Sequence, residues 1–204
     1  MQLWYASYGS NLSRDRFLCY LRGGRPEGAA RTYPGARDTT LPSADTAFVL
    51  PGNVFFGWHS PTPTWGGGIA FYDADGPGRA LGRAYLISEG QFADVAAQEM
   101  HREPGSDLDL STVLDERQHT VGPGRYEALH LVGELEGHPV ITFTSPEPAD
   151  VPTSAPSSAY LGMVARGLRE THEHTDDQLV DYLVDCPGVA PEWSRSEVAD
   201  LVAA

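Results

Sequence analysis

The order of secondary-structure signals along the chain constrains its fold more than any other feature. Strand-like stretches separated by Gly and Pro clusters dominate the first two-thirds, among them "QLWYASY", "VFFGWHS", "GGIAFYDA" and "ALGRAYLIS". The last third is helical, with "SSAYLGMVARGLRE", "TDDQLVDYLVDCPG" and "SRSEVADLVAA". Strands followed by helices predict an α+β fold with a mostly antiparallel or mixed β-sheet, which is open or closed into a barrel.

Capping residues place the first two helices. Ser13 can cap a short helix that Gly23-Gly24 ends. Ser88 and Gln91 form a capping box, which predicts that a longer helix begins at Glu89.

The length of the chain suits one domain, which we expect to span 1–204. Segment 102–124 is polar with Pro and Gly at both ends, which indicates an insertion with a short turn of helix. Segment 125–145 indicates a hairpin with its turn near Glu136-Gly137. Residues 157–204 are expected to form the C-terminal helical part.

The charge of the chain argues against several classes of partner. Asp and Glu number 28 against 14 Lys and Arg, which gives a net charge of −14. This negative charge repels phosphate backbones and anionic membranes, so an anionic ligand would need a local site that binds it against the repulsion. The chain has no run of eighteen apolar residues, and "MQLWYASY" lacks the features of a signal peptide, so we expect a cytoplasmic protein.

Glu99 lies on the helix face that should look inward. Phe92, Val95 and Ala96 occupy the apolar positions of this face, and Glu99 is the next position along it. Burial raises the pKa of a carboxyl group toward neutrality, where general acid–base catalysis needs it. A solvated carboxylate at the helix end, or one paired with Arg102, is the alternative.

Two glycine-containing stretches could approach a ligand. In "YGSN", residues 8–11, a Gly after a strand allows successive N–H groups to form an anion-binding nest beside a helix start. In "TWGGGIAF", residues 64–71, glycines that enter a strand indicate a bulge or the close approach of a ligand or another backbone. An ordinary turn and a flexible loop end are the alternatives.

Other motifs of catalysis or cofactor binding do not stand out. The sequence has no G-x-S-x-G elbow, no Walker loop and no dinucleotide fingerprint. Cys19 and Cys186 lie far apart without metal-type spacing and are expected to be free thiols. His172 and His174 are two positions apart and would not share a helix face, so a solvated helix end is expected there.

Four stretches occur in the order "YASYGSNL", "TWGGGIA", "AAQEM" and "APSSAYLGMVARGL". Together they resemble the γ-glutamylcyclotransferase family, over roughly Leu3 to Tyr182. The resemblance implies a small mixed barrel with helices around it. It also implies an enzyme that works without a metal or cofactor.

The resemblance implies roles for the matching residues. Glu99, in "AAQE", would be the catalytic carboxylate, and main-chain N–H groups of the Tyr8–Asn11 loop would hold the carboxylate of a γ-glutamyl group. The substrate pocket would be formed by Tyr5, Ala6, Ser7, Tyr8, Gly9, Ser10, Asn11, Trp65, Gly66, Gly67, Phe143 and Tyr160.

The implied reaction is intramolecular aminolysis of a γ-glutamyl amide or dipeptide. Glu99 would take a proton from the α-ammonium, the amine would attack the γ-carbonyl to close a lactam, and Glu99 would protonate the leaving amine. The products are 5-oxoproline and a free amine or amino acid. Because the nucleophile is tethered, the enzyme has only to hold the reactive conformer and move protons. The expected partner is this small molecule, without nucleic acid or membrane, and a homodimer stays open.

Two positions depart from the family pattern. Met100 stands where the family usually has Gly, and Phe143 where it often has a substrate-binding Tyr. These differences argue against the substrates of glutathione breakdown and leave a larger or modified γ-glutamyl amine, or another amide, open. Two other functions also stay open: a non-catalytic module that binds an amino-acid-like ligand, and an amide hydrolase with Ser10 as nucleophile, which needs a histidine in reach.

Overall fold

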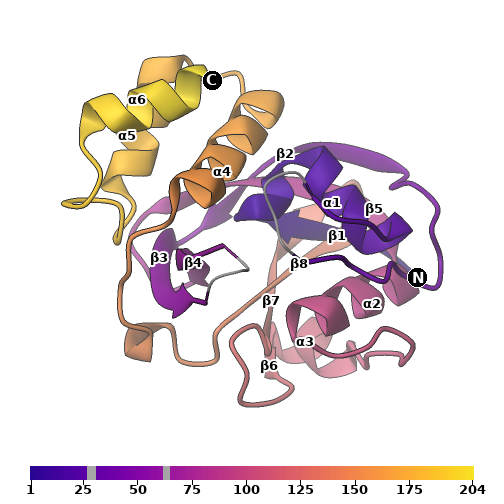
Figure 1. Ribbon diagram of the computed structural model, residues 1–204. Coiled ribbons are helices and arrows are strands. Elements are labelled where there is room, and N and C mark those ends of the chain that lie inside the picture. Colours follow the sequence, from indigo (N-terminus) through magenta and orange to yellow (C-terminus); the bar gives the residue numbers. More distant parts are fainter. Residues whose placement is uncertain (27–30, 62–64) are drawn as a thin grey trace.

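The computed structural model describes residues 1–26, 31–61 and 65–204 (Figure 1). A six-stranded sheet has the order β2-β5-β1-β8-β7-β6, and a separate two-stranded sheet pairs β3 with β4. The strands are β1 (Gln2–Ser7), β2 (Ala44–Pro51), β3 (Asn53–Ser60), β4 (Gly67–Asp73), β5 (Arg79–Ser88), β6 (Gln118–Thr120), β7 (Ala128–Leu135) and β8 (His138–Thr144). β1 is antiparallel to β5 and parallel to β8, so the predicted mixed sheet is confirmed.

The helices lie around this sheet, and the last three gather at one end of the molecule (Figure 1). They are α1 (Arg14–Arg22), α2 (Glu89–Glu99), α3 (Ser111–Glu116), α4 (Ser158–Thr171), α5 (Asp176–Asp185) and α6 (Arg195–Ala203). Two single turns of 3-10 helix, η1 (Ser10–Leu12) and η2 (Pro148–Asp150), complete the set. No helix among the described residues has both the length and the apolar character that crossing a membrane requires.

β1 is buried on both faces and divides the interior into two hydrophobic clusters. Leu3 and Tyr5 belong to the cluster that also contains residues of α1, α2 and α3. Trp4 and Ala6 belong to the other cluster, which contains residues of α4, α5 and α6. Successive side chains of a strand point to opposite faces, so one short strand supplies both cores.

The capping box predicted at the start of α2 is confirmed. The Ser88 side chain accepts a hydrogen bond from the Gln91 main chain at the start of α2, and equivalent boxes begin α5 and α6. Ser13 lies where a capping residue was predicted, but it does not cap the helix with its side chain. Ser13 is the residue before α1, but its side chain makes no capping hydrogen bond, and η1 fills the space between β1 and α1.

The segment 102–124 is more structured than its composition indicated. The short helix expected there is α3, whose Val113 is fully buried. The segment also contains β6, which pairs with β7 at the edge of the large sheet and was not predicted. Three residues are too few to show the alternation that identifies a strand in a sequence.

The predicted hairpin consists of β7 and β8, and its turn lies at Glu136-Gly137 as expected. Both turn residues have positive φ angles, 50° and 76°. This conformation matches the twist of a two-residue hairpin, and glycine adopts it without strain. β8 therefore returns beside β1 and brings Phe143 next to Tyr5, where their rings stack with centroids 5.1 Å apart.

The glycines that enter β4 permit a close approach of two main chains. A Cβ atom at Gly68 would lie 1.9 Å from the Ser154 carbonyl oxygen, and one at Gly67 would lie 2.7 Å from that of Ala155. The Gly68 N–H donates to the Ala155 carbonyl at 2.7 Å. The sequence left open whether a ligand or another backbone segment approaches these glycines. In the structure, the backbone segment that leads into α4 approaches them.

Replacement of Gly68 by alanine is expected to destabilise the fold by about 1–3 kcal/mol or more, because neither main chain can move away cheaply. Gly90 in α2 is the matched control, since a Cβ there meets no atom closer than 4.0 Å. Gly90→Ala should be neutral or stabilising by up to about 1 kcal/mol. Urea unfolding of both variants measures this, and equal stabilities would contradict the proposed close approach.

The stability of the fold should depend on pH through His172. This side chain is buried beside the Gly82 carbonyl, with Nε2 and oxygen 3.0 Å apart. Burial lowers its pKa, and His174 lowers it further, although the Gly82 carbonyl opposes the shift. A histidine whose pKa is lower in the folded state contributes stability above the unfolded value of about 6.5, and this contribution is lost as the pH falls below it.

His172→Gln keeps a side-chain N–H for the Gly82 carbonyl but cannot titrate. We expect the midpoint temperature of the variant to depend less steeply on pH between about 7.5 and 5.5 than that of the wild type. The exposed His59 supplies the control variant His59→Gln. Identical slopes in wild type and His172→Gln would show that His172 does not carry the effect.

Candidate active site

A pocket of about 150 Å³ opens beside the end of β1. Its walls come from η1, α1, the end of α2, the β3–β4 hairpin and the start of α4. Among the lining residues are nine that the sequence predicted: Tyr5, Tyr8, Gly9, Ser10, Asn11, Trp65, Glu99, Phe143 and Tyr160. Segments from all parts of the chain therefore meet where the family resemblance placed a site.

Four of the predicted site residues lie outside this lining. The Ala6 side chain belongs to the core under α4, and the Ser7 hydroxyl donates to the Arg83 carbonyl at 3.1 Å. Gly66 and Gly67 have positive φ angles of 66° and 102°, and the lack of a Cβ at Gly67 makes room for the Ala155 carbonyl. Their position accounts for a turn and a close packing of main chains.

Glu99 is the last residue of α2, and its side chain is half-buried. The helical-face prediction holds, because Phe92, Val95 and Ala96 are all buried. Asn11 Nδ2 donates to Glu99 Oε1 at 2.9 Å and also approaches the Tyr5 hydroxyl at 3.2 Å. The YGSN stretch thus holds the carboxylate through its asparagine side chain.

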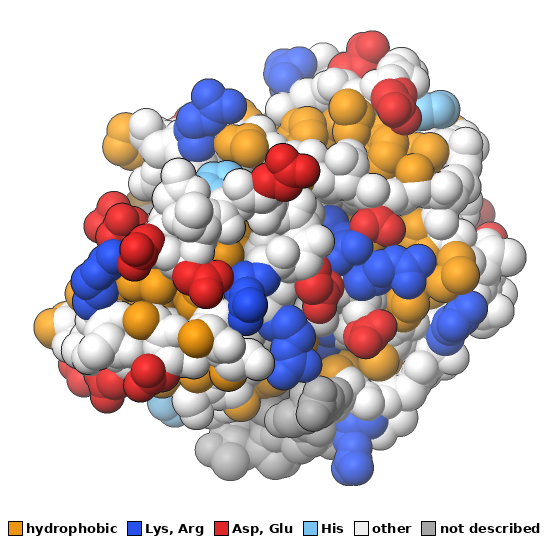
Figure 2. Space-filling view, turned by 90° about the horizontal axis from the view of Figure 1, so that it is seen from above, with side chains coloured by type: hydrophobic (Ala, Val, Ile, Leu, Met, Phe, Trp, Pro, Cys, Tyr) orange, Lys and Arg blue, Asp and Glu red, His pale blue; other side chains and the backbone are white. Residues whose placement is uncertain are grey.

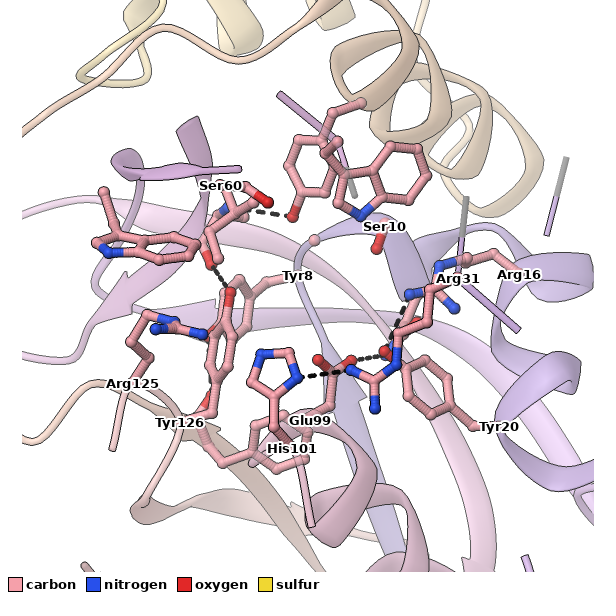
Figure 3. A pocket seen from close by; sticks show the side chains of 18 of the residues that line it. Tyr8, Ser10, Arg16, Tyr20, Arg31, Ser60, Glu99, His101, Arg125 and Tyr126 are labelled. Atoms are coloured by element: carbon pink, nitrogen blue, oxygen red, sulfur yellow. Dashed lines mark hydrogen bonds between the residues drawn. The ribbon is translucent and has the colours of Figure 1, made fainter. Parts of the chain in front are cut away.

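The alternative pairing of Glu99 with Arg102 is not what the structure has. Arg102 Nη2 lies 2.5 Å from Glu127 Oε1, so this arginine neutralises a different carboxylate. In Figure 3, Glu99 lies near the centre of the labelled side chains, with Arg125 and Tyr126 on one side and Arg16, Tyr20 and Arg31 on the other.

The end of α2 explains how Met100 replaces a glycine. Met100 follows the helix with a φ of −76°, a value that any residue adopts. The left-handed position is the next residue, His101, with a φ of 58°. Its main-chain N–H donates to the Gln98 carbonyl at 3.2 Å, and the Arg102 N–H to that of Ala97 at 2.7 Å, which ends the helix.

The sequence analysis did not identify three arginines that line the pocket: Arg16, Arg31 and Arg125. Arg16 is only 3% exposed, although it projects from a short helix near the chain start. A signal for it exists, because Arg16 and Tyr20 are one helical turn apart beside the apolar Phe17 and Leu21. An arginine on the inward face of a helix is unusual enough to be a candidate ligand contact.

Arg31 and Arg125 each contact an unusual partner. Arg31 Nη1 lies 2.6 Å from His101 Nδ1, and because a guanidinium can only donate, this nitrogen accepts. Burial, followed by the charges of Arg31 and Arg125, lowers the pKa of His101. The Arg125 guanidinium stacks 3.8 Å from the ring centroid of Trp58, a residue with a left-handed φ of 50°. A bulge in β3 between Gly57 and Ser60 produces this conformation.

The tyrosines of the pocket are neutral donors and acceptors. Burial raises the pKa of Tyr5 and Tyr8 well above the usual value, and that of Tyr160 to about 12. The Tyr8 hydroxyl donates to the Phe143 carbonyl at 2.8 Å, and the Tyr160 hydroxyl accepts from the Ala70 N–H at 3.0 Å. These bonds fix the phenol groups without any ligand.

Phe143 presents an apolar ring to the pocket, and a different residue supplies a hydroxyl near it. The Tyr126 ring meets the Phe143 ring edge-on, with centroids 6.1 Å apart. Its hydroxyl donates to the Ala70 carbonyl at 2.9 Å. The β4 main chain at Ala70 is therefore held between the hydroxyls of Tyr126 and Tyr160.

The arrangement does not favour Ser10 as a nucleophile. Among the described residues, no hydrogen bond joins the Ser10 hydroxyl to a histidine. His101 lines the same pocket, but its Nδ1 is bound to Arg31. The described residues also contain no group of three or more His, Cys, Asp or Glu side chains that could hold a metal ion.

Comparisons with known proteins bear on the fold. No family model matches the chain. A protein of Arabidopsis thaliana named histone deacetylase 5 is 29% identical over 201 residues, which cover 90% of this chain and 30% of that protein. The chain thus spans less than a third of the length of this relative.

Two solved structures cover 100% of this chain and 99% of their own, with a TM-score of 0.54 and 15% identity. One is named γ-glutamyl cyclotransferase, and the other is described as an ensemble refinement of an uncharacterized protein from Homo sapiens. The chain therefore has the γ-glutamyl cyclotransferase-like fold that the sequence resemblance implied.

The Tyr160 hydroxyl should stabilise the wall of the pocket. Tyr160→Phe leaves the Ala70 N–H buried without its acceptor, so we expect a loss of about 1–3 kcal/mol in the free energy of unfolding. Tyr182→Phe is a matched comparison far from the pocket, because its hydroxyl accepts from the Leu81 N–H at 3.1 Å. Urea denaturation should give losses of similar size, and an unchanged Tyr160→Phe would contradict the assigned hydrogen bond.

Proposed function

We propose that this protein converts a γ-glutamyl amide or dipeptide into 5-oxoproline and a free amine or amino acid, with Glu99 as general base and acid. The observation that carries this proposal is the placement of Glu99 in the pocket by Asn11 of the YGSN loop. The fold alone would not suffice, because one fold supports many functions. The position of the Glu99 carboxylate in the pocket supports the proposal beyond the fold, because a carboxylate there can accept and donate protons.

The contacts of Glu99 support different roles for its two carboxylate oxygens. Asn11 Nδ2 occupies Oε1, which fixes the rotation of the carboxylate. The other oxygen would take the proton from the substrate α-ammonium. The free amine then attacks the γ-carbonyl carbon, and Glu99 gives its proton to the departing nitrogen as the C–N bond to the leaving group breaks. The ring nitrogen loses its second proton to solvent, which leaves the neutral lactam.

The remaining walls suit a ligand held in a folded conformation. Ring closure needs the amine and the γ-carbonyl side by side, and a pocket of about 150 Å³ walled by aromatic rings favours such a compact conformer. When the pocket binds the reactive conformer, the flexible chain loses its conformational entropy on binding. The cyclisation step then has a lower barrier, because this loss no longer belongs to it. The chain thus needs no covalent intermediate for this chemistry.

Release of 5-oxoproline from a panel of γ-glutamyl dipeptides and γ-glutamyl amines tests the proposal. We expect turnover by the wild type and a loss of at least about 100-fold in kcat for Glu99→Gln, the upper range of what general acid–base catalysis contributes being about 10⁴-fold. The exposed Glu103 gives the control variant Glu103→Gln, which should retain full activity.

The outcomes separate the competing functions. Saturable binding of the same ligands without 5-oxoproline would favour the non-catalytic module. Release of free glutamate in place of the lactam would favour an amide hydrolase. Lactam formation that survives in Glu99→Gln would remove Glu99 from the mechanism.

A further inference from the structure

Arg16 is a buried cation that forms no direct ion pair with a carboxylate among the described residues, although Glu99 attracts it from further away. Its Nη2 donates to the hydroxyls of Tyr20 and Tyr33, at 2.9 and 2.7 Å. Its Nε and Nη1 atoms are buried and have no hydrogen-bond partner. A buried guanidinium with two unsatisfied donors is costly, so such a group is expected to serve a ligand.

Another buried arginine shows how the fold treats a charge that is purely structural. Arg83 is almost as buried as Arg16, and it pairs with both Asp45 and Glu170. Arg16 receives tyrosine rings and hydroxyls in place of acids, with its guanidinium 4.6 and 4.5 Å from the ring centroids of Tyr20 and Tyr33. These groups hold the cation in position and leave its charge available.

The pocket is locally cationic in an acidic protein. Three arginines line it, and Glu99 is the only Asp or Glu among the lining residues described. Elsewhere on the surface the two signs are mixed, and Figure 2 shows arginines and acids interspersed on one face. An anion would therefore be stabilised inside this pocket, although the net charge of −14 does not attract it from a distance.

We propose that Arg16 is a carboxylate-binding residue, and that it joins the main-chain N–H groups of the Tyr8–Asn11 loop in holding the carboxylate of the γ-glutamyl group beside Glu99. The inference rests on the proposed function and deepens it. In an α-amino acid, the ammonium and the carboxylate are attached to the same carbon. A ligand with its ammonium at Glu99 must place its carboxylate nearby, and Figure 3 shows Arg16 and Tyr20 on the side of the pocket next to Glu99.

The position of Arg16 relative to the YGSN loop agrees with this assignment. Arg16 follows Ser10 and Asn11 by six and five residues, and all three residues line the pocket. Trp65 covers the same region, with its ring centroid 5.8 Å from the guanidinium. The carboxylate would thus be enclosed between a fixed cation and an aromatic ring, where water screens a charge pair little.

The first test uses the intact protein and the product itself. 5-Oxoproline carries the carboxylate in question, and 2-pyrrolidinone is the same ring without it. Calorimetric titration of the wild type should give binding of 5-oxoproline at least about tenfold tighter than of 2-pyrrolidinone, as a charge-assisted hydrogen bond contributes. Equal affinities would overturn the inference.

The second test asks whether Arg16 causes the difference. Glu99→Gln protein binds substrates without turnover in the proposed mechanism, so it can be titrated with γ-glutamylglycine and two analogues. One analogue has a carboxamide at the glutamyl carboxylate, and the other has it at the glycine carboxylate. We expect the first change to weaken binding by about 10- to 100-fold and the second to have little effect.

Adding Arg16→Gln should remove this discrimination, while Arg16→Lys should restore part of it because it keeps the charge. Arg22→Gln, at the exposed end of α1, is the control. Discrimination that persists in Arg16→Gln, or that follows the glycine carboxylate, would overturn the assignment. If Arg16→Gln fails to fold, Arg16→Lys decides: a lysine cannot reproduce the paired donors of a guanidinium, so discrimination equal to that of the wild type would overturn the assignment.

The two proposals can fail separately. If the wild type forms no lactam but still prefers the carboxylate ligands through Arg16, the catalytic proposal is wrong and the binding residue stands. If the lactam forms and Arg16→Gln keeps both kcat/KM and its preference for the carboxylate, the reverse holds.

Discussion

Strand β1 constrains the rest of this molecule, because it is paired along both edges and buried on both faces. Its register with β5 extends from Gln2 to Ser7, and β8 pairs with it in parallel on the other edge. The strand cannot shift by one residue without exchanging the contents of the two cores. The YGSN loop leaves the end of this strand, so its position is fixed by the pairing of strands that are distant in sequence.

The same constraint places Glu99. α2 begins directly after β5, the neighbour of β1, and its apolar face packs on the cluster that contains Tyr5. The helix ends after three turns at the height of the YGSN loop, where Asn11 meets the carboxylate. Two segments 88 residues apart in the chain thus meet because their parent strands are adjacent.

Local patterns in the sequence were sufficient for most elements, since capping boxes and apolar periodicity depend on neighbouring residues. Ser88 and Gln91, and the face of Phe92, Val95 and Ala96, were identified correctly for this reason. At Gly67, the sequence indicated a close approach but did not show whether a ligand or another backbone segment makes it. Deciding between them needs the path of residues 154–157, which no local pattern describes.

The arginines of the pocket were missed for a related reason. In a sequence, Arg16 has the appearance of one more charge on a short amphipathic helix, and its burial depends on Tyr33 and Trp65 from later segments. Arg31 and Arg125 come from segments without a regular pattern. Long-range packing therefore decided which of the 14 cations of the chain became part of the pocket.

The two departures from the family pattern have local structural explanations that leave the pocket intact. Met100 adopts an ordinary helical φ because His101 takes the left-handed position after it, so glycine is not needed there. Phe143 keeps the aromatic ring that stacks on Tyr5 and loses only a hydroxyl. Because the polar groups near Glu99 come from Asn11, Tyr20 and the arginines, the loss of that hydroxyl changes one wall of the pocket and not the surroundings of Glu99. The proposed reaction therefore predicts a ligand that differs from a simple γ-glutamyl amino acid in the part that contacts Phe143, and whose charged end meets Glu99 and Arg16.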